Sequence, residues 1–367
     1  MSADAPLVLL AAGGTGGHLF PAEALANALK QRGVAVDLAT DRRAAAYAGQ
    51  FPARRVHVLP SDTVRGRNPL RLALTALVLG YGILRAAFLL LRLRPVAVVG
   101  FGGYPTLPPL IAARLCGIPG IIHDANAVLG RANRFLSRHV DAIATSLPGV
   151  LDRDPALALK AITVGTPMRP MILTAASVPY EPPAASGSFR VLVVGGSQGA
   201  RVMSDVVPAA IERLEPALWS RLALTQQVRE EDMGRVRAVY DRLKVNAELA
   251  PFFTDLPARL AANHLVVSRS GAGTVAELAA IGRPSILVPL PGAIDQDQFA
   301  NAGVLSQVNG GLRIVQSEFT PDRLASEISA LAAEPARLAA MAASARAVGR
   351  LDAAERLADV VTKVAGI

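Results

Sequence analysis

The stretch LVLLAAGGTGGHLFPAEALANALKQRG, residues 7–33, places a short apolar run, a cluster of glycines and a histidine directly before a helical pattern. Continuous apolar runs of this length are typical of strands that are buried on both faces of a parallel sheet. Glycines at the following turn let backbone N–H groups approach an anion, and the start of the helix adds a partial positive charge. The stretch therefore predicts a strand, turn and helix of the Rossmann type, with a phosphate or a sugar near the turn.

The same pattern returns along the chain. Short apolar runs alternate with longer amphipathic segments on both sides of residue 188, and the turn VVGGSQGA at 193–200 echoes AAGGTGGH at 11–18. This order predicts an α/β protein with two Rossmann-like domains and parallel sheets. We expect the domains to cover residues 1–170 and 171–349. The Pro-, Ala- and Ser-rich segment 174–188 has the composition of a linker.

The end of the chain is Ala-rich. Its pattern predicts one last helix over roughly residues 334–365, and we expect the part from about 350 to 367 to pack back on the first domain.

Composition narrows the function classes. The chain has 367 residues, of which 51% are hydrophobic and 18% charged, as in a well-buried globular protein. Cys116 is the single cysteine, which leaves no internal disulfide, and no signal peptide is visible at the N-terminus, so we expect a cytoplasmic protein.

The charge is unevenly distributed. Residues 1–178 hold 19 Lys and Arg against 9 Asp and Glu, whereas the remainder holds 19 against 20. A basic first half suits nucleic acid, an anionic membrane or a phosphorylated ligand. Nucleic acid is disfavoured because only 4% of the residues are aromatic and no recognised binding motif is present.

The segment LALTALVLGYGIL, residues 72–84, carries no charge. The arginines that flank it are Arg65, Arg67, Arg71, Arg85, Arg92 and Arg94. A membrane-spanning helix needs about 20 apolar residues, and we expect Arg85 to end the run before that length. Two interpretations stay open: a buried connecting helix, or an exposed apolar face that rests on an anionic membrane surface.

His18 stands at the start of the first predicted helix. The helix dipole disfavours its charged form, so a neutral imidazole is expected near pH 7, as a general base requires. A structural histidine that caps the helix is the alternative.

The turn lacks the lysine of a P-loop. It matches a dinucleotide turn only in part, so a nicotinamide enzyme that uses Asp41 for the ribose is a remote alternative.

Three further motifs carry candidate ligands for a nucleotide. GGSQGAR offers the Ser197 hydroxyl, and GTPMR places Arg169 at the domain junction, where a guanidinium can clamp a diphosphate. SRSGAGTVAEL at 268–278 follows an apolar run, and its Glu277 is placed for two ribose hydroxyls. A glutamate that merely stabilises the helix start is the alternative for Glu277.

Taken together, these motifs resemble the MurG family of cell-wall glycosyltransferases. The segments that carry the resemblance, in order, are GGTGGH, GFGGYPT, NAVLGRANR, GTPMR, GGSQGA, SRSGAGTVAE and DQDQFANA, within about residues 7–305. The resemblance implies a GT-B fold, with the two sheets facing an interdomain cleft. It also implies inverting transfer of N-acetylglucosamine from UDP-N-acetylglucosamine to a lipid-linked muramyl pentapeptide in peptidoglycan synthesis. No cofactor and no metal are implied, and the expected location is peripheral, on the cytoplasmic face of the bacterial cell membrane.

The resemblance also assigns roles to residues. His18 corresponds to the base that takes the proton from the C4 hydroxyl of the acceptor. The implied donor-binding residues are Thr15, Gly16, Gly17, Asn126, Arg169, Ser197, Phe253, Thr274, Glu277, Asp297, Gln298 and Asn301. The implied acceptor-binding residues are Gly13, Gly14, Gly102, Gly103, Tyr104 and Asn133.

The chain departs from the family pattern in two places. HDAN at 123–126 stands where the family often has H-E-Q-N, and Asp297 stands where it tends to have His or Gln. DQD at 295–297 resembles a metal-binding D-x-D, but its position favours a sugar contact. The alternatives to the transferase are a UDP-N-acetylglucosamine 2-epimerase and a non-catalytic nucleotide-sugar binding protein.

Overall fold

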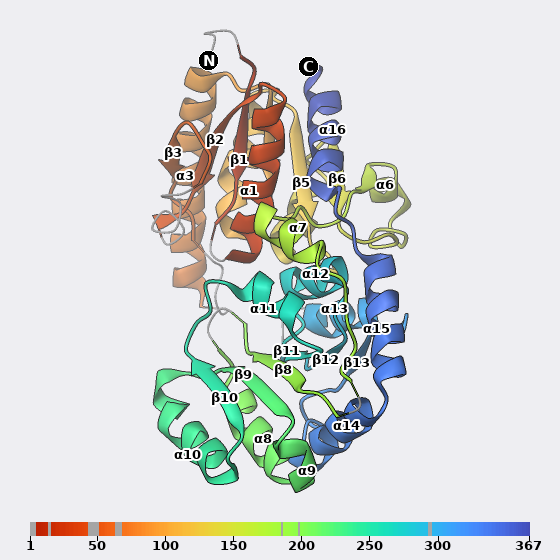
Figure 1. The fold of residues 1–367 in the computed structure, drawn as a ribbon. Coiled ribbons are helices and arrows are strands. Elements are labelled where there is room, and N and C mark those ends of the chain that lie inside the picture. The colour runs from red at the N-terminus through yellow and green to blue at the C-terminus, as the bar shows by residue number, and fades with distance from the viewer. Residues whose placement is uncertain are drawn as a thin grey trace. The chain divides into compact units, whose positions relative to one another are not determined.

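The computed structural model describes residues 5–13, 16–42, 51–62, 68–184, 186–196, 199–292 and 296–367, with Leu72 described by its backbone alone. The chain forms two compact units, shown in Figure 1. The first comprises Met1–Arg169 together with Leu351–Ile367, and the second comprises Pro170–Arg350. Each unit is described by itself below.

The first unit is built on a seven-stranded sheet in the order β3-β2-β1-β4-β5-β6-β7, with every pair parallel. Its strands are β1 (Leu7–Ala11), β2 (Ala35–Thr40), β3 (Val56–Val58), β4 (Ala97–Gly100), β5 (Gly120–Asp124), β6 (Ala142–Thr145) and β7 (Ala161–Thr163). Its helices are α1 (Gly16–Gln31), α3 (Pro69–Leu93), η2 (Tyr104–Thr106), α4 (Leu107–Leu115), α5 (Arg131–Leu136), α6 (Pro155–Ala158) and α16 (Ala353–Ala365).

Helices cover both faces of this sheet, which is why its strands are apolar throughout. Leu10 points into a core formed with α1 and α16, whereas its neighbour Leu9 points into a core formed with α3, α4 and α5. Neighbouring strand residues face opposite sides, so both must be buried in a doubly covered sheet. The predicted α/β architecture is confirmed.

The second unit repeats the design with a six-stranded parallel sheet in the order β10-β9-β8-β11-β12-β13. Its strands are β8 (Phe189–Val194), β9 (Leu222–Gln227), β10 (Asn246–Ala250), β11 (Leu265–Ser268), β12 (Ser285–Leu287) and β13 (Gly311–Arg313). Its helices are α7 (Pro170–Ala176), α8 (Arg201–Glu212), α9 (Pro216–Trp219), η3 (Glu230–Asp232), α10 (Met233–Leu243), α11 (Leu256–Ala262), α12 (Ala272–Ile281), α13 (Asp297–Ser306), α14 (Pro321–Ala333) and α15 (Pro335–Val348).

Two expectations about connections are wrong. Segment 174–188 is no linker between the units, because it lies within the second unit, where Arg283 donates to the Val178 carbonyl and the Tyr180 hydroxyl donates to the His264 carbonyl. The single helix over 334–365 is two helices, α15 and α16. The helical conformation is interrupted at Gly349, where a Cβ atom would lie 2.5 Å from the Ala279 carbonyl oxygen.

Helix α16 closes the core of the first unit. Arg32, just after the end of α1, donates hydrogen bonds of 2.6 Å to Glu355 and 2.7 Å to Asp359 on α16. The apolar side chains of α16, including Leu357 and Val361, are fully buried against α1 and the sheet. The last residues of the chain are therefore part of the first unit.

Helix α3 is longer than its uncharged segment. It begins at an N-cap, where Asn68 Oδ1 accepts from the Leu70 N–H, and it continues past Arg85 to Leu93. Arg85 interrupts the uncharged run as expected, but this exposed arginine leaves the helix intact. Among the described residues, α3 is the one helix that by length and composition could cross a membrane.

One face of α3 packs and the other is exposed. Ala86 and Leu90 are buried with α4, and Gly82 lies so close to the Pro60 carbonyl that a Cβ atom would collide with it. This close approach explains a glycine in the middle of a helix. The large apolar side chains exposed on the helix are Leu70, Leu74, Leu77, Tyr81, Leu84, Phe88 and Leu91.

Candidate functional site

The first candidate site lies where the strand order of the first sheet reverses. Strands β1 and β4 are neighbours in the sheet, yet their connecting helices α1 and α4 cover opposite faces. The loops that follow the carboxyl ends of two such strands diverge and leave a binding crevice. His18 lies in the first turn of α1, and Gly102 and Gly103 lie in the loop after β4.

The His18 ring packs on the backbone of the glycine pair after β4. A Cβ atom at Gly102 would lie 3.2 Å from Cε1 of His18, and one at Gly103 would lie 3.4 Å from Cδ2. The φ angles are +91° at Gly102 and +76° at Gly103, a region that other residues rarely adopt. The motif therefore needs glycine twice over, for its backbone conformation and to leave room for the imidazole.

His18 is held as a neutral ring. Burial lowers its pKa below the ordinary value, while the negative charge of Asp124 and a hydrogen bond with the Phe101 backbone act in the opposite direction. The cause expected from the sequence is the helix dipole, whereas removal of the ring from solvent is the largest cause in the structure. An uncharged imidazole can accept a proton near pH 7.

Asp124 organises the loop after β5. Its carboxylate accepts hydrogen bonds from the backbone N–H groups of Asn126 (3.0 Å) and Gly130 (2.9 Å) and from the side chain of Asn133 (2.9 Å). The Asn126 side chain also donates to it, at 3.2 Å. The shorter acid in HDAN is thus the centre of a tight loop rather than a group that extends into solvent.

Asn133 lies beneath this loop and is almost fully buried. Its amide nitrogen donates both to Asp124 and to the His123 carbonyl, at 3.0 Å. These bonds hold α5 on the end of β5. Among the described residues, no hydrogen-bond partner is found for the Asn133 side-chain oxygen.

Arg169, the last residue of the first unit, stacks on an aromatic ring of α1. Its guanidinium carbon lies 3.6 Å from the centre of the Phe20 ring. Burial raises the pKa of the nearby Glu23 carboxyl, and the positive charge of Arg169 opposes that rise. Gly16 lies under the same ring, since a Cβ atom there would approach Phe20 to 2.9 Å. Gly13 is packed in the same way on Pro105, since a Cβ atom at Gly13 would lie 2.8 Å from Cγ of Pro105.

The second candidate site lies at the corresponding reversal of the second sheet, between β8 and β11. The turn after β8 contains Gly196 and Gly199, whose φ angles are +92° and +67°. The turn after β11 leads through Gly271 into α12. Glycine-rich turns at helix starts of this kind bind the phosphates of nucleotides.

Residues of α13 hold the turn before α12. The buried Ser270 hydroxyl donates to the Gln298 carbonyl at 2.7 Å, and the Asn301 side chain donates to the Ser270 carbonyl at 3.3 Å. The Gln298 side-chain oxygen accepts from the Leu290 N–H at 3.0 Å, and Asp297 accepts from the Gln298 N–H at 2.8 Å. The motif DQDQFANA is therefore bound to the SRSGAG turn.

The remaining predicted residues take the following places. Thr274 and Glu277 are half-buried on α12, and Phe253 is buried under the guanidinium of Arg259, 4.3 Å from the ring centre. Tyr104 is half-buried at the start of η2, and Gly17 is exposed in the first turn of α1. Gly14, Thr15 and Ser197 lie outside the described residues.

Within the described ranges, no group of three or more His, Cys, Asp or Glu side chains is arranged to hold a metal ion. Asp295, the first residue of DQD, lies outside those ranges.

Two polar side chains that sequence reasoning missed lie beside the second site. Gln227, the last residue of β9, accepts from the Gly195 N–H at 3.0 Å. Arg229 donates to the Gly199 carbonyl at 3.3 Å. Both contacts depend on the parallel pairing of β9 with β8, for which the sequence carries no local signal.

Comparison with known protein families gives matches in both halves of the chain. Residues 8–145 match the glycosyltransferase family 28 N-terminal domain, and residues 190–357 match the family 28 C-terminal domain.

Characterised relatives match over the whole length. A protein of Bradyrhizobium sp. (strain BTAi1) is 76% identical over 100% of both chains, and one of Rhodopseudomonas palustris (strain BisB18) is 73% identical over 99% of this chain and 97% of its own. Both are named UDP-N-acetylglucosamine–N-acetylmuramyl-(pentapeptide) pyrophosphoryl-undecaprenol N-acetylglucosamine transferase.

Solved structures agree in fold. MurG of Acinetobacter baumannii superposes with a TM-score of 0.78 at 29% identity, over 98% of this chain and 99% of its own. A 2-epimerase-like protein of Listeria monocytogenes reaches a TM-score of 0.69 over 98% of this chain and 96% of its own. At 13% identity, that second likeness concerns the fold alone.

Proposed function

Since this chain belongs to glycosyltransferase family 28, we propose that it transfers N-acetylglucosamine from UDP-N-acetylglucosamine to the lipid-linked muramyl pentapeptide of peptidoglycan synthesis. Its fold is GT-B, with two Rossmann-like units. The acceptor is N-acetylmuramyl-(pentapeptide) pyrophosphoryl-undecaprenol, the substrate in the names of its relatives.

The observation that carries the mechanism is the neutral His18 ring packed on Gly102 and Gly103. In our proposal, this imidazole takes the proton from the C4 hydroxyl of the acceptor. The hydroxyl oxygen then attacks C1 of the donor sugar, and the bond between C1 and the diphosphate oxygen breaks with inversion. UDP leaves with the electron pair, and the proton stays on His18.

The charge of the leaving diphosphate must be offset where it develops. We assign this task to Arg169 and to the glycine turn after β8, which includes Ser197. Glu277 takes the ribose hydroxyls, backbone groups near Phe253 bind the uracil, and Thr274 lines the same site. The residues proposed to face the donor sugar and its surroundings are Thr15, Gly16, Gly17, Asn126, Asp297, Gln298 and Asn301.

The acceptor diphosphate is assigned to the loops of the first unit, around Gly13, Gly14, Gly102, Gly103 and Tyr104. Asn133 acts indirectly in this proposal, because its buried amide binds Asp124 and the His123 carbonyl. It positions the loop that carries Asn126.

A transfer assay tests the reaction. Labelled N-acetylglucosamine should move from UDP-N-acetylglucosamine to a short-chain lipid-linked acceptor, and His18→Ala should lower kcat roughly 10²- to 10⁴-fold with donor affinity nearly unchanged. The control is His139→Ala, which removes an exposed histidine of the same unit. Full activity of His18→Ala would remove His18 from the mechanism. Release of N-acetylmannosamine from donor alone would instead identify an epimerase.

We also propose that α3 docks the protein on the cytoplasmic face of the membrane. Its exposed apolar residues recur at alternating spacings of four and three, so they form one stripe along the helix. Arg71, Arg85 and Arg92 lie on the same helix and suit anionic lipid headgroups. The opposite side of α3 packs on α4, which favours a helix that lies on the surface.

Vesicle flotation tests this docking. The wild-type protein should float with vesicles that contain anionic lipid, less so at high salt, and Leu77→Glu with Leu84→Glu should abolish flotation without loss of stability. Val178→Glu, an exposed apolar position of the second unit, is the matched control. Undiminished flotation of the α3 variant would contradict the proposal.

A further inference from the structure

The turn after β8 is closed tightly on itself. A Cβ atom at Gly195 would collide with the backbone of Ala200, and it would lie 2.6 Å from the carbonyl carbon of Gly199. Gly196 and Gly199 both have positive φ angles. A turn so folded keeps its shape only if its two ends stay together.

Two side chains hold those ends: Gln227, the last residue of the adjacent strand β9, and Arg229, two residues beyond it. Gln227 binds the Gly195 N–H at one end, and its own amide donates to the Pro251 carbonyl at 3.1 Å. Arg229 binds the Gly199 carbonyl at the other end, and its Cγ lies 3.1 Å from where a Cβ atom of Gly199 would be. The arginine thus both packs under the turn and bonds to it.

The guanidinium of Arg229 keeps part of its hydrogen-bonding capacity unused. Its Nε is buried and has no hydrogen-bond partner among the residues that the structure describes. Glu231, with which it forms an ion pair, lies 3.7 Å away and is largely exposed, so the pairing neutralises the arginine weakly. A positive charge therefore remains beside the turn.

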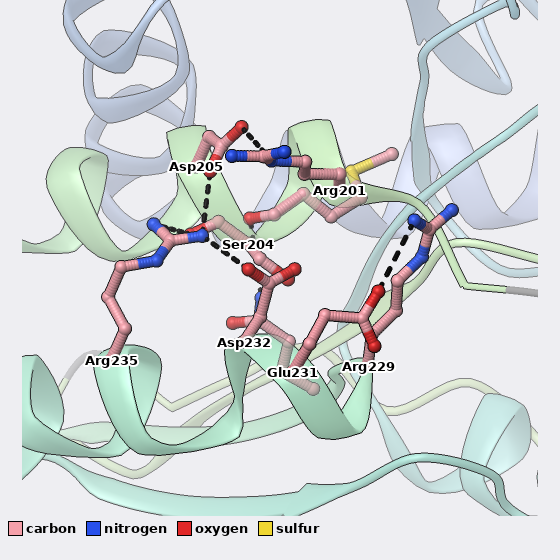
Figure 2. A network of polar contacts seen from close by, with 9 residues as sticks. Arg201, Ser204, Asp205, Arg229, Glu231, Asp232 and Arg235 are labelled. Atoms are coloured by element: carbon pink, nitrogen blue, oxygen red, sulfur yellow. Dashed lines mark hydrogen bonds and ion pairs between the residues drawn. The ribbon is translucent and has the colours of Figure 1, made fainter.

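The segment that carries Arg229 is itself fixed to α8, as Figure 2 shows. Arg235 donates to Asp205 on α8 at 2.7 Å and to Asp232 at 2.8 Å, and it also binds the Ser204 carbonyl. These bonds lower the pKa of Asp232, so its carboxylate stays charged. Arg235 is paired with two carboxylates, whereas Arg229 donates to the Gly199 carbonyl of the glycine turn.

We propose that Arg229 is a positioning residue of the donor site, which holds the Gly199 end of the turn after β8 and keeps a positive charge beside it for the diphosphate of the nucleotide sugar. This inference rests on the proposed function. It assigns to the second unit an arginine that none of the sequence motifs contains. Its effect must grow with the number of phosphates on the ligand, because the turn and the charge serve the phosphates rather than the base.

The experiment measures binding of uridine, UMP and UDP by calorimetry to the full chain, as wild type and as Arg229→Met, Arg229→Lys and Arg242→Met. Methionine preserves the packing under Gly199 but removes the charge and the hydrogen bond. We expect Arg229→Met to weaken UDP about tenfold or more, UMP less, and uridine hardly at all. Arg229→Lys should recover part of the UDP affinity. Arg242→Met, on α10 of the same unit, removes a largely exposed pair with Glu212, so it should bind all three ligands like wild type.

Steady-state kinetics give a second readout. Arg229→Met should raise KM for UDP-N-acetylglucosamine much more than it lowers kcat. Wild-type UDP affinity in Arg229→Met would overturn the inference, as would an equal loss for uridine and UDP, which would indicate general damage to the unit. If the wild-type chain bound no UDP at all, the proposed function would fail together with this inference.

Discussion

The imidazole of His18 lies on the backbone of Gly102, where even a methyl group would come within 3.2 Å of the ring. One residue follows β1 and the other follows β4, so the contact exists only because these strands pair in parallel. A glycine and a histidine that are more than eighty residues apart in the chain thus form one feature of the candidate site.

Gly102→Ala should therefore damage both backbone and catalysis. The φ of +91° is strained for alanine, at about 1–3 kcal/mol, and the new methyl group displaces the His18 ring. We expect a lower denaturation midpoint and a clear fall in kcat. Gly117→Ala is the matched control, because its φ is +69° but a Cβ atom there meets nothing within 4 Å. It should lose stability alone; equal kcat values for the two variants would refute the expectation.

The pH dependence of kcat/KM should report the His18 pKa. The base must be neutral, so activity falls as the pH drops through that pKa, and burial sets the midpoint of this acidic limb below 6.5. A midpoint above 6.5 in the wild-type profile would contradict a buried neutral base.

Asp124→Asn should move that limb to lower pH. The Asp124 carboxylate raises the His18 pKa and burial lowers it. Removal of the carboxylate charge therefore lowers the His18 pKa further. Asp141→Asn serves as the control, since Asp141 binds the Gly120 N–H at the other end of β5. A limb that stays in place in Asp124→Asn would show that the charge of Asp124 does not act on the base.

His264 should make the protein less stable in acid. Burial, with Arg190 and Arg283 nearby, lowers its pKa to about 4 in the folded state, whereas the unfolded value is about 6.5. The unfolded chain thus binds more protons in this window, and the stabilisation present above pH 6.5 is lost as the pH falls towards 4. The full loss is about 3 kcal/mol.

Denaturant unfolding at pH 7 and pH 4.5 measures this effect. His264→Gln has no titratable group at that position, so its free energy of unfolding should fall less than that of wild type between the two pH values. Parallel losses in the two proteins would exclude His264 as a cause.

Arg32→Ala should loosen the C-terminal helix. The lost bonds to Glu355 and Asp359 are partly exposed, so the expected cost is no more than about 1 kcal/mol. Hydrogen exchange should nevertheless quicken in α16. Arg356→Ala removes a local pair with Asp352, the residue just before α16, and should cost about 0.3 kcal/mol without releasing the helix. Faster exchange in both variants alike would argue against the role of Arg32.

The sequence predicts the elements whose signals are local. The run before Gly13 and the run before Gly195 stand out because they are apolar and end in glycine, and both are strands. The edge strands β3 and β13 are not predicted from the sequence, since each has three residues and β3 exposes Val56 and Val58. Short strands at an edge carry too few buried positions to be recognised.

Long-range contacts of the candidate sites could not be predicted in the same way. The GFGG motif is visible, but its contact with His18 follows from strand order. Arg229 stands in the sequence REED, which resembles a solvated charge run, and only the register of β9 places it under Gly199. Arg85 interrupts the uncharged run 72–84, but the sequence does not show that the helix continues past it, because an exposed helical position tolerates an arginine.

Because α16 belongs to the first unit, that unit is complete only after residues 351–367 have been translated. Its strands and α1 emerge early, but residues 170–350 must be translated before α16 appears, which takes about 10 to 40 s at ordinary bacterial speeds. During that delay the apolar face of α1 that packs on α16 stays exposed. Chaperones that bind nascent polypeptides can recognise such a face. The second unit is continuous in the chain, so it can complete its fold before the first unit does, although its translation begins later.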